Sequence, residues 1–199
     1  MIDLWPPENE IYDEGFRLIC GVDEAGRGPL AGPVCAAAVI LPRNLQIDGL
    51  NDSKKLTGTK REKLYDIIKA SALSYGIAFA SVEEIEELNI LNATFLAMNR
   101  AISQLSPVPE LALIDGNRSS GVNFNCRCVI KGDSSCADIA AASVLAKVTR
   151  DRTMLELAEK YPEYHFEQHK GYGTKLHYEA LREFGPSPVH RLSFLRKMH

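Results

Sequence analysis

The sequence predicts an α/β fold in which helices flank a mixed sheet and a helical extension follows at the C-terminus. Two apolar, strand-like runs at 17–23 and 34–41 are joined by a glycine- and proline-rich turn. Beyond them, segments with helical periodicity alternate with short apolar runs, and only helical patterns follow residue 139. Adjacent strands followed by alternating helices and strands are typical of a mixed sheet covered by helices.

The first part of the chain supplies three strands and one helix. The continuous apolar character of the first two strands indicates that both of their faces are covered, and 75–82 alternates as a third strand. Between them we expect a polar loop at 48–56 and a helix at 59–73. Four apolar residues share one face of that helix: Leu64, Ile67, Ile68 and Ala72.

Two consecutive helices are predicted next. Ser81 and Glu84 have the spacing of a capping box, which predicts a short helix ending at Leu88. A second helix follows Asn92 and ends before Pro107. Its apolar stripe is expected in the core and consists of Phe95, Met98, Ile102 and Leu105.

The second half of the chain supplies the remaining strands and the longest helix. Apolar runs at 111–114 and 127–130 predict strands, and each leads to an aspartate. The alanine-rich segment 139–161 predicts a long helix. Weaker helical patterns occupy 175–184 and 188–198. We expect one domain, residues 1–199, with 161–199 as its helical extension.

The composition is that of a soluble globular protein, with 45% apolar and 25% charged residues. No apolar run is long enough to span a bilayer, and the N-terminus has no secretory signal, so we expect a cytosolic protein. The five cysteines lack paired C-x-x-C spacing and are expected to be reduced thiols. A soft-metal site at Cys126, Cys128 and Cys136 is the less favoured alternative, because no histidine or fourth cysteine lies nearby.

Charge is distributed unevenly, although the net charge is only −3. Residues 1–146 hold 13 Lys and Arg against 19 Asp and Glu, whereas 147–199 hold 10 against 7. Phosphate contact depends on local Lys and Arg rather than on the total. The asymmetry therefore suggests an acidic metal centre beside a basic docking surface, although charged runs are usually solvated faces.

Four acidic residues share one sequence context, the end of an apolar run: Asp23, Glu24, Asp115 and Asp133. If the strands are neighbours, the carboxylates converge, and so many like charges cannot all ionise without cations. Hard oxygen ligands suit Mg²⁺ or Mn²⁺. Two such ions about 3.5–4 Å apart would form a clamp for phosphoryl displacement.

Each of these acids also has a purely structural explanation. Asp115 precedes Gly116, which is typical of a turn, and Asp133 is placed to cap the helix that begins near residue 135. Adjacent residues of a regular strand point to opposite faces, so Asp23 and Glu24 reach one site only where the strand ends or distorts. We favour the metal site because the four acids share one context.

Two further segments are candidates for ligand binding. The turn Gly26-Arg27-Gly28 leaves backbone N–H groups accessible, and Arg27 can pair with a carboxylate or a phosphate. A plain hairpin turn is the alternative. Tyr172 lies between two glycines, so we expect it to be exposed and able to stack on a sugar or base, although an ordinary loop has the same composition.

The long helix carries a polar stripe formed by residues 143, 147, 150 and 151. We treat this stripe as a candidate functional surface. The alternative is a solvated edge on which Lys147 and Asp151 form an ion pair.

In seven blocks spread over nearly the whole chain, the sequence resembles ribonuclease HII, the bacterial type 2 ribonuclease H. The blocks are 21–30, 50–56, 88–91, 114–117, 131–133, 141–151 and 169–174. The resemblance implies a ribonuclease H-like fold whose extension, 161–199, binds substrate. It also implies Mg²⁺- or Mn²⁺-dependent cleavage of RNA in RNA–DNA hybrids and beside single ribonucleotides in duplex DNA, leaving 5′-phosphate and 3′-hydroxyl ends.

The resemblance also implies residue roles. Asp23, Glu24, Asp115 and Asp133 would hold the metals. The backbone of Gly26, Arg27 and Gly28 would sense the ribose 2′-hydroxyl, and Tyr172 would stack at the RNA-to-DNA junction. Lys54, Ser143 and Lys147 would contact phosphate or support the site. Leu192 replaces an arginine of the family pattern, which removes one DNA-facing charge. We expect a monomer.

Two other functions stay open on the sequence alone. Because fold does not fix substrate, the same carboxylates would also suit a resolvase, an integrase or another nuclease. A non-catalytic module that binds hybrids belongs to a different class, and the intact set of carboxylates argues against it.

Overall fold

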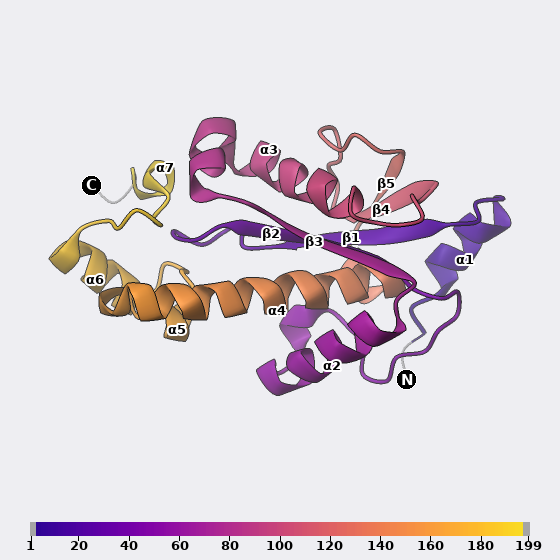
Figure 1. Ribbon diagram of the computed structural model, residues 1–199, viewed down its shortest axis with the longest axis horizontal. Helices are drawn as coiled ribbons and strands as arrows, with labels where there is room; N and C mark the ends of the chain where they lie inside the picture. Colours follow the sequence, from indigo (N-terminus) through magenta and orange to yellow (C-terminus); the bar gives the residue numbers. More distant parts are fainter. Residues whose placement is uncertain (1–2, 197–199) are drawn as a thin grey trace.

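The computed structural model describes residues 3–196, and a five-stranded mixed sheet lies at its centre (Figure 1). The strand order is β3-β2-β1-β4-β5. The strands are β1 (Ile19–Ala25), β2 (Val34–Ile40), β3 (Ser74–Ala80), β4 (Leu111–Asp115) and β5 (Cys126–Val129). Strand β2 pairs antiparallel with β1 and β3, whereas β4 pairs parallel with β1 and β5. The predicted mixed sheet is therefore confirmed.

Helices cover both faces of the sheet. Figure 1 shows α3 (Val82–Ile102) on one side, and α2 (Gly58–Ser71) and α4 (Ala137–Lys160) on the other. Alternate residues of β2 enter the two cores, Ala37 packing with α2 and α4 and Ala38 with α3. Helix α4 lies so close to β1 that a methyl group on Gly21 would overlap the backbone of Ile139. This close packing brings α4 beside the end of β1.

Helix α2 and the loop before it differ from their predictions. Ile67, predicted to share one apolar face with Leu64 and Ile68, is 46% exposed, and Tyr65 is buried instead, so the buried face of α2 is rotated. The segment 48–56 is not a plain loop, because it contains the 3₁₀ helix η1 (Ser53–Lys55). The side chain of Asp52 accepts a hydrogen bond from the N–H of Lys54 and starts this turn.

The two helices predicted for 81–105 form the two segments of α3. The capping box of Ser81 and Glu84 is present. Asn89 has a φ of 68° and breaks the helix. Its side-chain oxygen accepts hydrogen bonds from the N–H groups of Leu91 and Asn92. The second segment therefore begins after Asn89 rather than after Asn92. The predicted apolar stripe is buried.

The N-terminal helix α1 (Pro6–Asp13) had no counterpart in the sequence-based prediction. Glu8 of this helix is 0% exposed, and its carboxylate accepts hydrogen bonds from the N–H groups of Ala137 and Asp138 at 3.1 and 2.8 Å. An acidic side chain from a distant helix thus caps α4.

The segment after α4 packs against the end of that helix and against residues 30–31. Its elements are η3 (Pro162–Tyr164), α5 (Phe166–His169), α6 (Lys175–Phe184) and α7 (Leu192–Leu195). Helix α6 matches its prediction. The helix predicted at 188–198 is wrong for the described residues, where only α7 is helical, because His190 closes a turn with Ser187 instead. Residues 197 and 198 lie outside the described range.

Among residues 3–196, no helix has the length and apolar content needed to cross a bilayer. All five cysteines are free, and three of them are buried: Cys20, Cys35 and Cys136. Cys128 is exposed on β5, so the three cysteines of the alternative soft-metal site have different environments.

Candidate metal centre

Three of the four predicted acids converge. Val22 of β1 pairs with Ile114 of β4, so the next residues, Asp23 and Asp115, lie side by side. Asp133 comes from a separate 3₁₀ turn, η2 (Gly132–Ser134). One oxygen from each aspartate lies within 4.8 Å of the other two. This arrangement provides three carboxylate ligands from three elements to one point.

The local origin of Asp133 differs from its prediction. The strand before it is short and half-exposed, and Ile130 is 74% exposed, so Asp133 does not follow a buried strand. Its carboxylate accepts a hydrogen bond from Lys54 at 3.4 Å and from Ser134 at 3.3 Å. Because Glu8 caps α4, the capping role considered for Asp133 is wrong.

Glu24 stands beside this group of three rather than in it. Glu24 follows Asp23 at the end of β1, and the two residues line one cleft. The carboxylate of Glu24 forms an ion pair with Arg27 at 3.3 Å and lines a pocket with Phe95 of α3. Asp115 lines the same pocket, so Glu24 adjoins the aspartates at the edge of the sheet.

The electrostatics of the cluster favour a bound cation. Burial raises the pKa of Asp23 well above its usual range, and the charges of Glu24 and Asp115 raise it further. Burial and the charge of Asp133 raise the pKa of Asp115. Burial also raises the pKa of Glu24, although Arg27 opposes the rise. Crowded carboxylates with only oxygen donors fit a hard divalent ion, which would relieve their repulsion.

The 3₁₀ helix η1 presents Lys54 to the aspartate cluster. Its ammonium group lies 3.4 Å from the carboxylate of Asp133, while its side chain is 72% exposed. Burial works to lower the pKa of Lys54, but the carboxylates of Asp23 and Asp133 outweigh this effect and raise it. Lys54 can therefore turn between the carboxylates and a ligand in solvent.

A cleft of about 220 Å³ joins the carboxylates to most of the other predicted residues. Its lining includes Asp23, Glu24, Asp115, Gly26, Arg27, Gly28, Lys54, Lys147 and Tyr172. Tyr172 is 45% exposed, as predicted, and its ring lies 3.6 Å from the position that a Cβ on Gly28 would occupy. The glycine turn and the tyrosine thus form one wall of the cleft.

The polar stripe predicted on α4 is only partly at the surface. Ser143 is 3% exposed, and its hydroxyl lies 2.7 Å from that of Ser53, so it supports the site from within. Lys147 forms an ion pair with Asp151 at 2.7 Å, which was the alternative explanation. Arg150 is 1% exposed and is not part of a solvated face.

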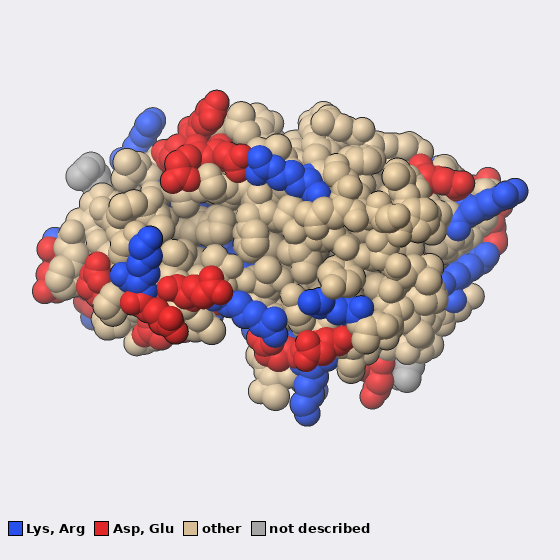
Figure 2. Space-filling model, in the orientation of Figure 1, with Lys and Arg blue, Asp and Glu red and all other residues tan. Residues whose placement is uncertain are grey.

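The basic docking surface predicted from the C-terminal charge excess needs the same correction. Arg150 and Arg191 are both internal, where they bond to backbone carbonyl groups, and add no charge to the exterior. On the face shown in Figure 2, basic side chains are interspersed with acidic ones. Arg191 directly precedes Leu192, and its burial had no signal in the sequence.

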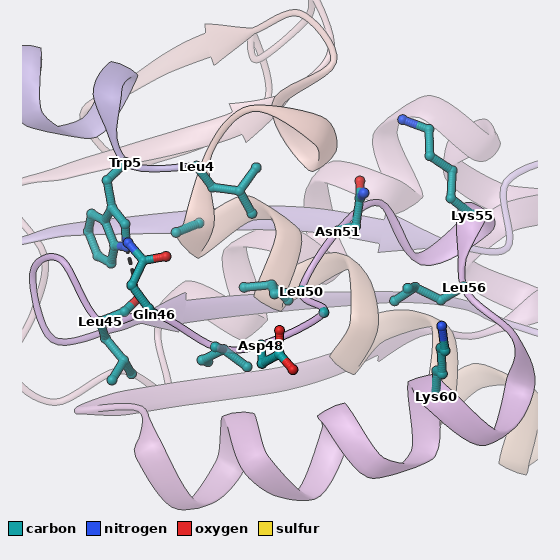
Figure 3. Close-up of a pocket in the computed structure, with 13 residues that line it drawn as sticks. Leu4, Trp5, Leu45, Gln46, Asp48, Leu50, Asn51, Lys55, Leu56 and Lys60 are labelled. Atoms are coloured by element: carbon teal, nitrogen blue, oxygen red, sulfur yellow. Dashed lines mark hydrogen bonds between the residues drawn. The ribbon is translucent and has the colours of Figure 1, made fainter. Parts of the chain in front are cut away.

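A second pocket, of about 330 Å³, lies between the N-terminal segment and the loop that leads to η1 (Figure 3). Trp5 and Leu4 line it, and the indole N–H of Trp5 donates a hydrogen bond to the carbonyl of Leu45 at 2.8 Å. Its charged lining residues are Asp48, Lys55 and Lys60. A single carboxylate offers no cluster of ligands, so this pocket does not compete with the aspartates as a metal centre.

Comparisons with known protein families and with curated proteins give the same family. The family model described as Ribonuclease HII matches residues 20–197. Ribonuclease HII of Caldicellulosiruptor bescii is 53% identical over 191 residues, which cover 96% of this chain and 93% of that protein. Ribonuclease HII of Endomicrobium trichonymphae is 56% identical over 188 residues, covering 94% and 90%. The crystal structure of ribonuclease H2 from Pyrococcus horikoshii OT3 has a TM-score of 0.72 at 27% identity and covers 89% of this chain and 93% of that one.

Proposed function

The chain belongs to the ribonuclease HII family of endonucleases, which cleave RNA in RNA–DNA hybrids, and we propose that it makes this cut 5′ of single ribonucleotides in duplex DNA as well. Hydrolysis at that bond would leave 5′-phosphate and 3′-hydroxyl ends. The observation that carries the proposal is the convergence of Asp23, Asp115 and Asp133 within 4.8 Å, at a cleft walled by a glycine turn.

The carboxylates hold divalent ions in this proposal. Asp23, Asp115 and Asp133 would hold the ions, and Glu24, which lines the same cleft as Asp23, would complete the set. Two bound ions would lower the barrier to attack by water and stabilise charge on the leaving oxygen. Mg²⁺ or Mn²⁺ fits the all-oxygen donor set. Family membership supports metal dependence, and the choice between the two ions is part of the proposal.

The cleft positions the nucleic acid. The backbone of Gly26, Arg27 and Gly28 contacts the ribonucleotide and senses its 2′-hydroxyl, because only RNA carries that group. Tyr172 stacks on the sugar or base beside it, which its exposed ring permits. Lys54 contacts a phosphate and thereby leaves the carboxylate of Asp133.

Two supporting groups act from further away. Ser143 orders the site through Ser53 and Asp23 and does not touch the substrate. Lys147, paired with Asp151, supplies positive charge at the edge of the cleft. The segment 161–199 extends the substrate surface beyond Tyr172, with Leu192 exposed where the family pattern has an arginine.

The proposal also covers the oligomeric state and the cellular compartment. We propose a monomer, because one chain supplies all three converging aspartates. We propose a cytosolic location, because five free thiols suit a reducing compartment.

The direct test uses a DNA duplex that contains one ribonucleotide and an all-DNA duplex of the same sequence. With Mg²⁺ or Mn²⁺, the first is expected to be cut on the 5′ side of the ribonucleotide, and the second to stay intact. A chelator should abolish cutting. Equal cleavage of both duplexes would instead indicate a nuclease without ribose recognition.

A further inference from the structure

Two fully buried arginines lie behind the glycine turn. Arg150 of α4 is 1% exposed, and Arg191, which directly precedes α7, is 0% exposed. Among the described residues, neither forms an ion pair with a carboxylate. Their guanidinium groups donate to backbone carbonyls instead. Burying a cation without a counter-charge is costly, so this arrangement needs an explanation.

Arg191 uses every N–H group that a guanidinium carries. Its Nε donates to the carbonyl of Gly32 at 2.9 Å. Its Nη1 donates to the carbonyls of Arg27 and Pro29 at 3.0 and 2.9 Å. Its Nη2 donates to the carbonyls of Gly26 and Gly32, both at 2.7 Å. One side chain from the far end of the sequence therefore fixes the backbone of the whole turn.

Arg150 secures the same turn from α4 and joins it to the tyrosine loop. It donates to the carbonyls of Ala31 and Pro33 at 3.1 and 3.0 Å, and to the carbonyl of Lys170 at 3.1 Å. The N–H of Leu30 donates to the carbonyl of Gly171 at 2.8 Å, which closes the connection. The glycine turn and the tyrosine loop, which together form one wall of the cleft, are thus held in one geometry.

The N–H groups of Arg27 and Gly28 are the backbone groups of the turn that matter for a ligand. Arg191 engages the carbonyl groups of Gly26, Arg27, Pro29 and Gly32. In the part of the chain that the structure describes, no backbone carbonyl accepts a hydrogen bond from the N–H of Arg27 or Gly28. Both residues line the cleft. The two buried positive charges also strengthen the attraction of these N–H groups for an oxygen acceptor.

We propose that Arg191 is a positioning residue for ribonucleotide recognition, because it locks the turn so that the N–H groups of Arg27 and Gly28 face the ribose. This inference rests on the proposed function. Arg191 does not touch the substrate. Its effect is on the preference for a duplex that contains a 2′-hydroxyl, rather than on metal binding or on general affinity for DNA.

The test compares the binding of two duplexes that differ only in one 2′-hydroxyl, in the presence of a chelator so that neither is cut. The full-length protein is expected to prefer the ribonucleotide duplex by up to about tenfold, the range of one or two hydrogen bonds. Arg191→Lys should bring the ratio close to one, since lysine has three donors and no planar fork. Arg150→Lys, the second variant, should lower it less.

Ile102→Ala is the matched control. Ile102 is buried in α3, on the face of the sheet opposite α4, so its substitution lowers stability without touching the turn. It should keep the full ratio. Folded Arg191→Lys or Arg150→Lys protein with the unaltered ratio would overturn the inference while leaving the proposed function intact. Absence of any preference in the unaltered protein, together with absence of cleavage, would overturn both.

Discussion

The hydroxyl groups of Ser53 and Ser143 lie 2.7 Å apart in the interior, and this contact joins η1, which presents Lys54, to α4. Ser143 also hydrogen-bonds to Asp23, and this contact works to lower the pKa of that carboxyl group. Ser143→Ala should therefore lower the free energy of unfolding by about 1–3 kcal/mol, because it leaves the buried hydroxyl of Ser53 unpaired. Urea denaturation measures this loss.

The matched control for that substitution is Ser103→Ala. The Ser103 hydroxyl donates to the carbonyl of Asn99 at an exposed position. Its removal should cost less than about 0.5 kcal/mol. Equal losses in the two variants would contradict the assignment of a structural role to Ser143.

Lys54→Ala should affect metal and nucleic acid in opposite directions. Removing the ammonium group beside Asp133 takes away a competing cation, so the affinity for Mn²⁺, measured by calorimetry, should rise. The KM for a hybrid should increase, because a phosphate contact is lost. Lys55→Ala is the neighbouring control, since Lys55 bonds to Asp52 and to the hydroxyl of Ser134 but forms no ion pair with the three aspartates. A weaker affinity for Mn²⁺ in Lys54→Ala would contradict this account.

Tyr172 should act through its ring. Tyr172→Ala removes a stacking surface worth about 1–3 kcal/mol, so binding of a single-ribonucleotide duplex should weaken by about 5- to 150-fold. Tyr172→Phe retains the ring and should bind nearly as well as the unaltered protein. The ring is 45% exposed, so neither change should reduce stability greatly. Equal weakening in both variants would show that the hydroxyl, not stacking, carries the contact.

A buried pair of histidines is expected to make the fold less stable at acid pH. The Nε2 atoms of His177 and His190 lie 3.0 Å apart, and burial lowers the pKa of both groups to about 4. The unfolded chain therefore binds more protons than the folded one between about pH 6.5 and 4. Stability should fall as the pH falls through this window, by at most about 3 kcal/mol for each histidine.

The carboxyl group of Glu8 opposes this trend, because burial raises its pKa to about 7 and so stabilises the folded state toward low pH. His177→Gln removes one histidine contribution while leaving Glu8 unchanged. Its unfolding free energy should fall less than that of the unaltered protein between pH 7 and pH 4.5, as measured by urea titrations. Parallel losses in the two proteins would contradict the assignment.

The sequence predicted the features that depend on local pattern. Continuous apolar runs identified β1, β2 and β4, and the spacing of Ser81 and Glu84 identified the start of α3. The sequence also placed Asp23 and Asp115 at strand ends, where they would meet if the strands were neighbours, and the parallel pairing of β1 with β4 supplies that condition. The order of apolar and polar residues within a single helix or strand is enough to predict that element.

The features that sequence reasoning missed depend on tertiary partners. Glu8 caps a helix that begins 129 residues away, and Arg191 bonds to a turn at residues 26–32, so neither burial has a local signal. Charged residues are usually exposed, which made the surface the default prediction for Arg150. Only the assembled fold supplies the carbonyl groups that make these buried charges tolerable.

The central claim is that the converging carboxylates bind the divalent ions used in cleavage, and Asp115→Asn tests it most directly. The amide keeps the size of the side chain and removes its charge, while Asp48→Asn, in the separate pocket of Figure 3, is the matched control. We predict that Asp115→Asn binds the single-ribonucleotide duplex but does not cut it in Mg²⁺, whereas Asp48→Asn cuts normally. Cleavage by Asp115→Asn at the rate of the unaltered protein would contradict the metal assignment.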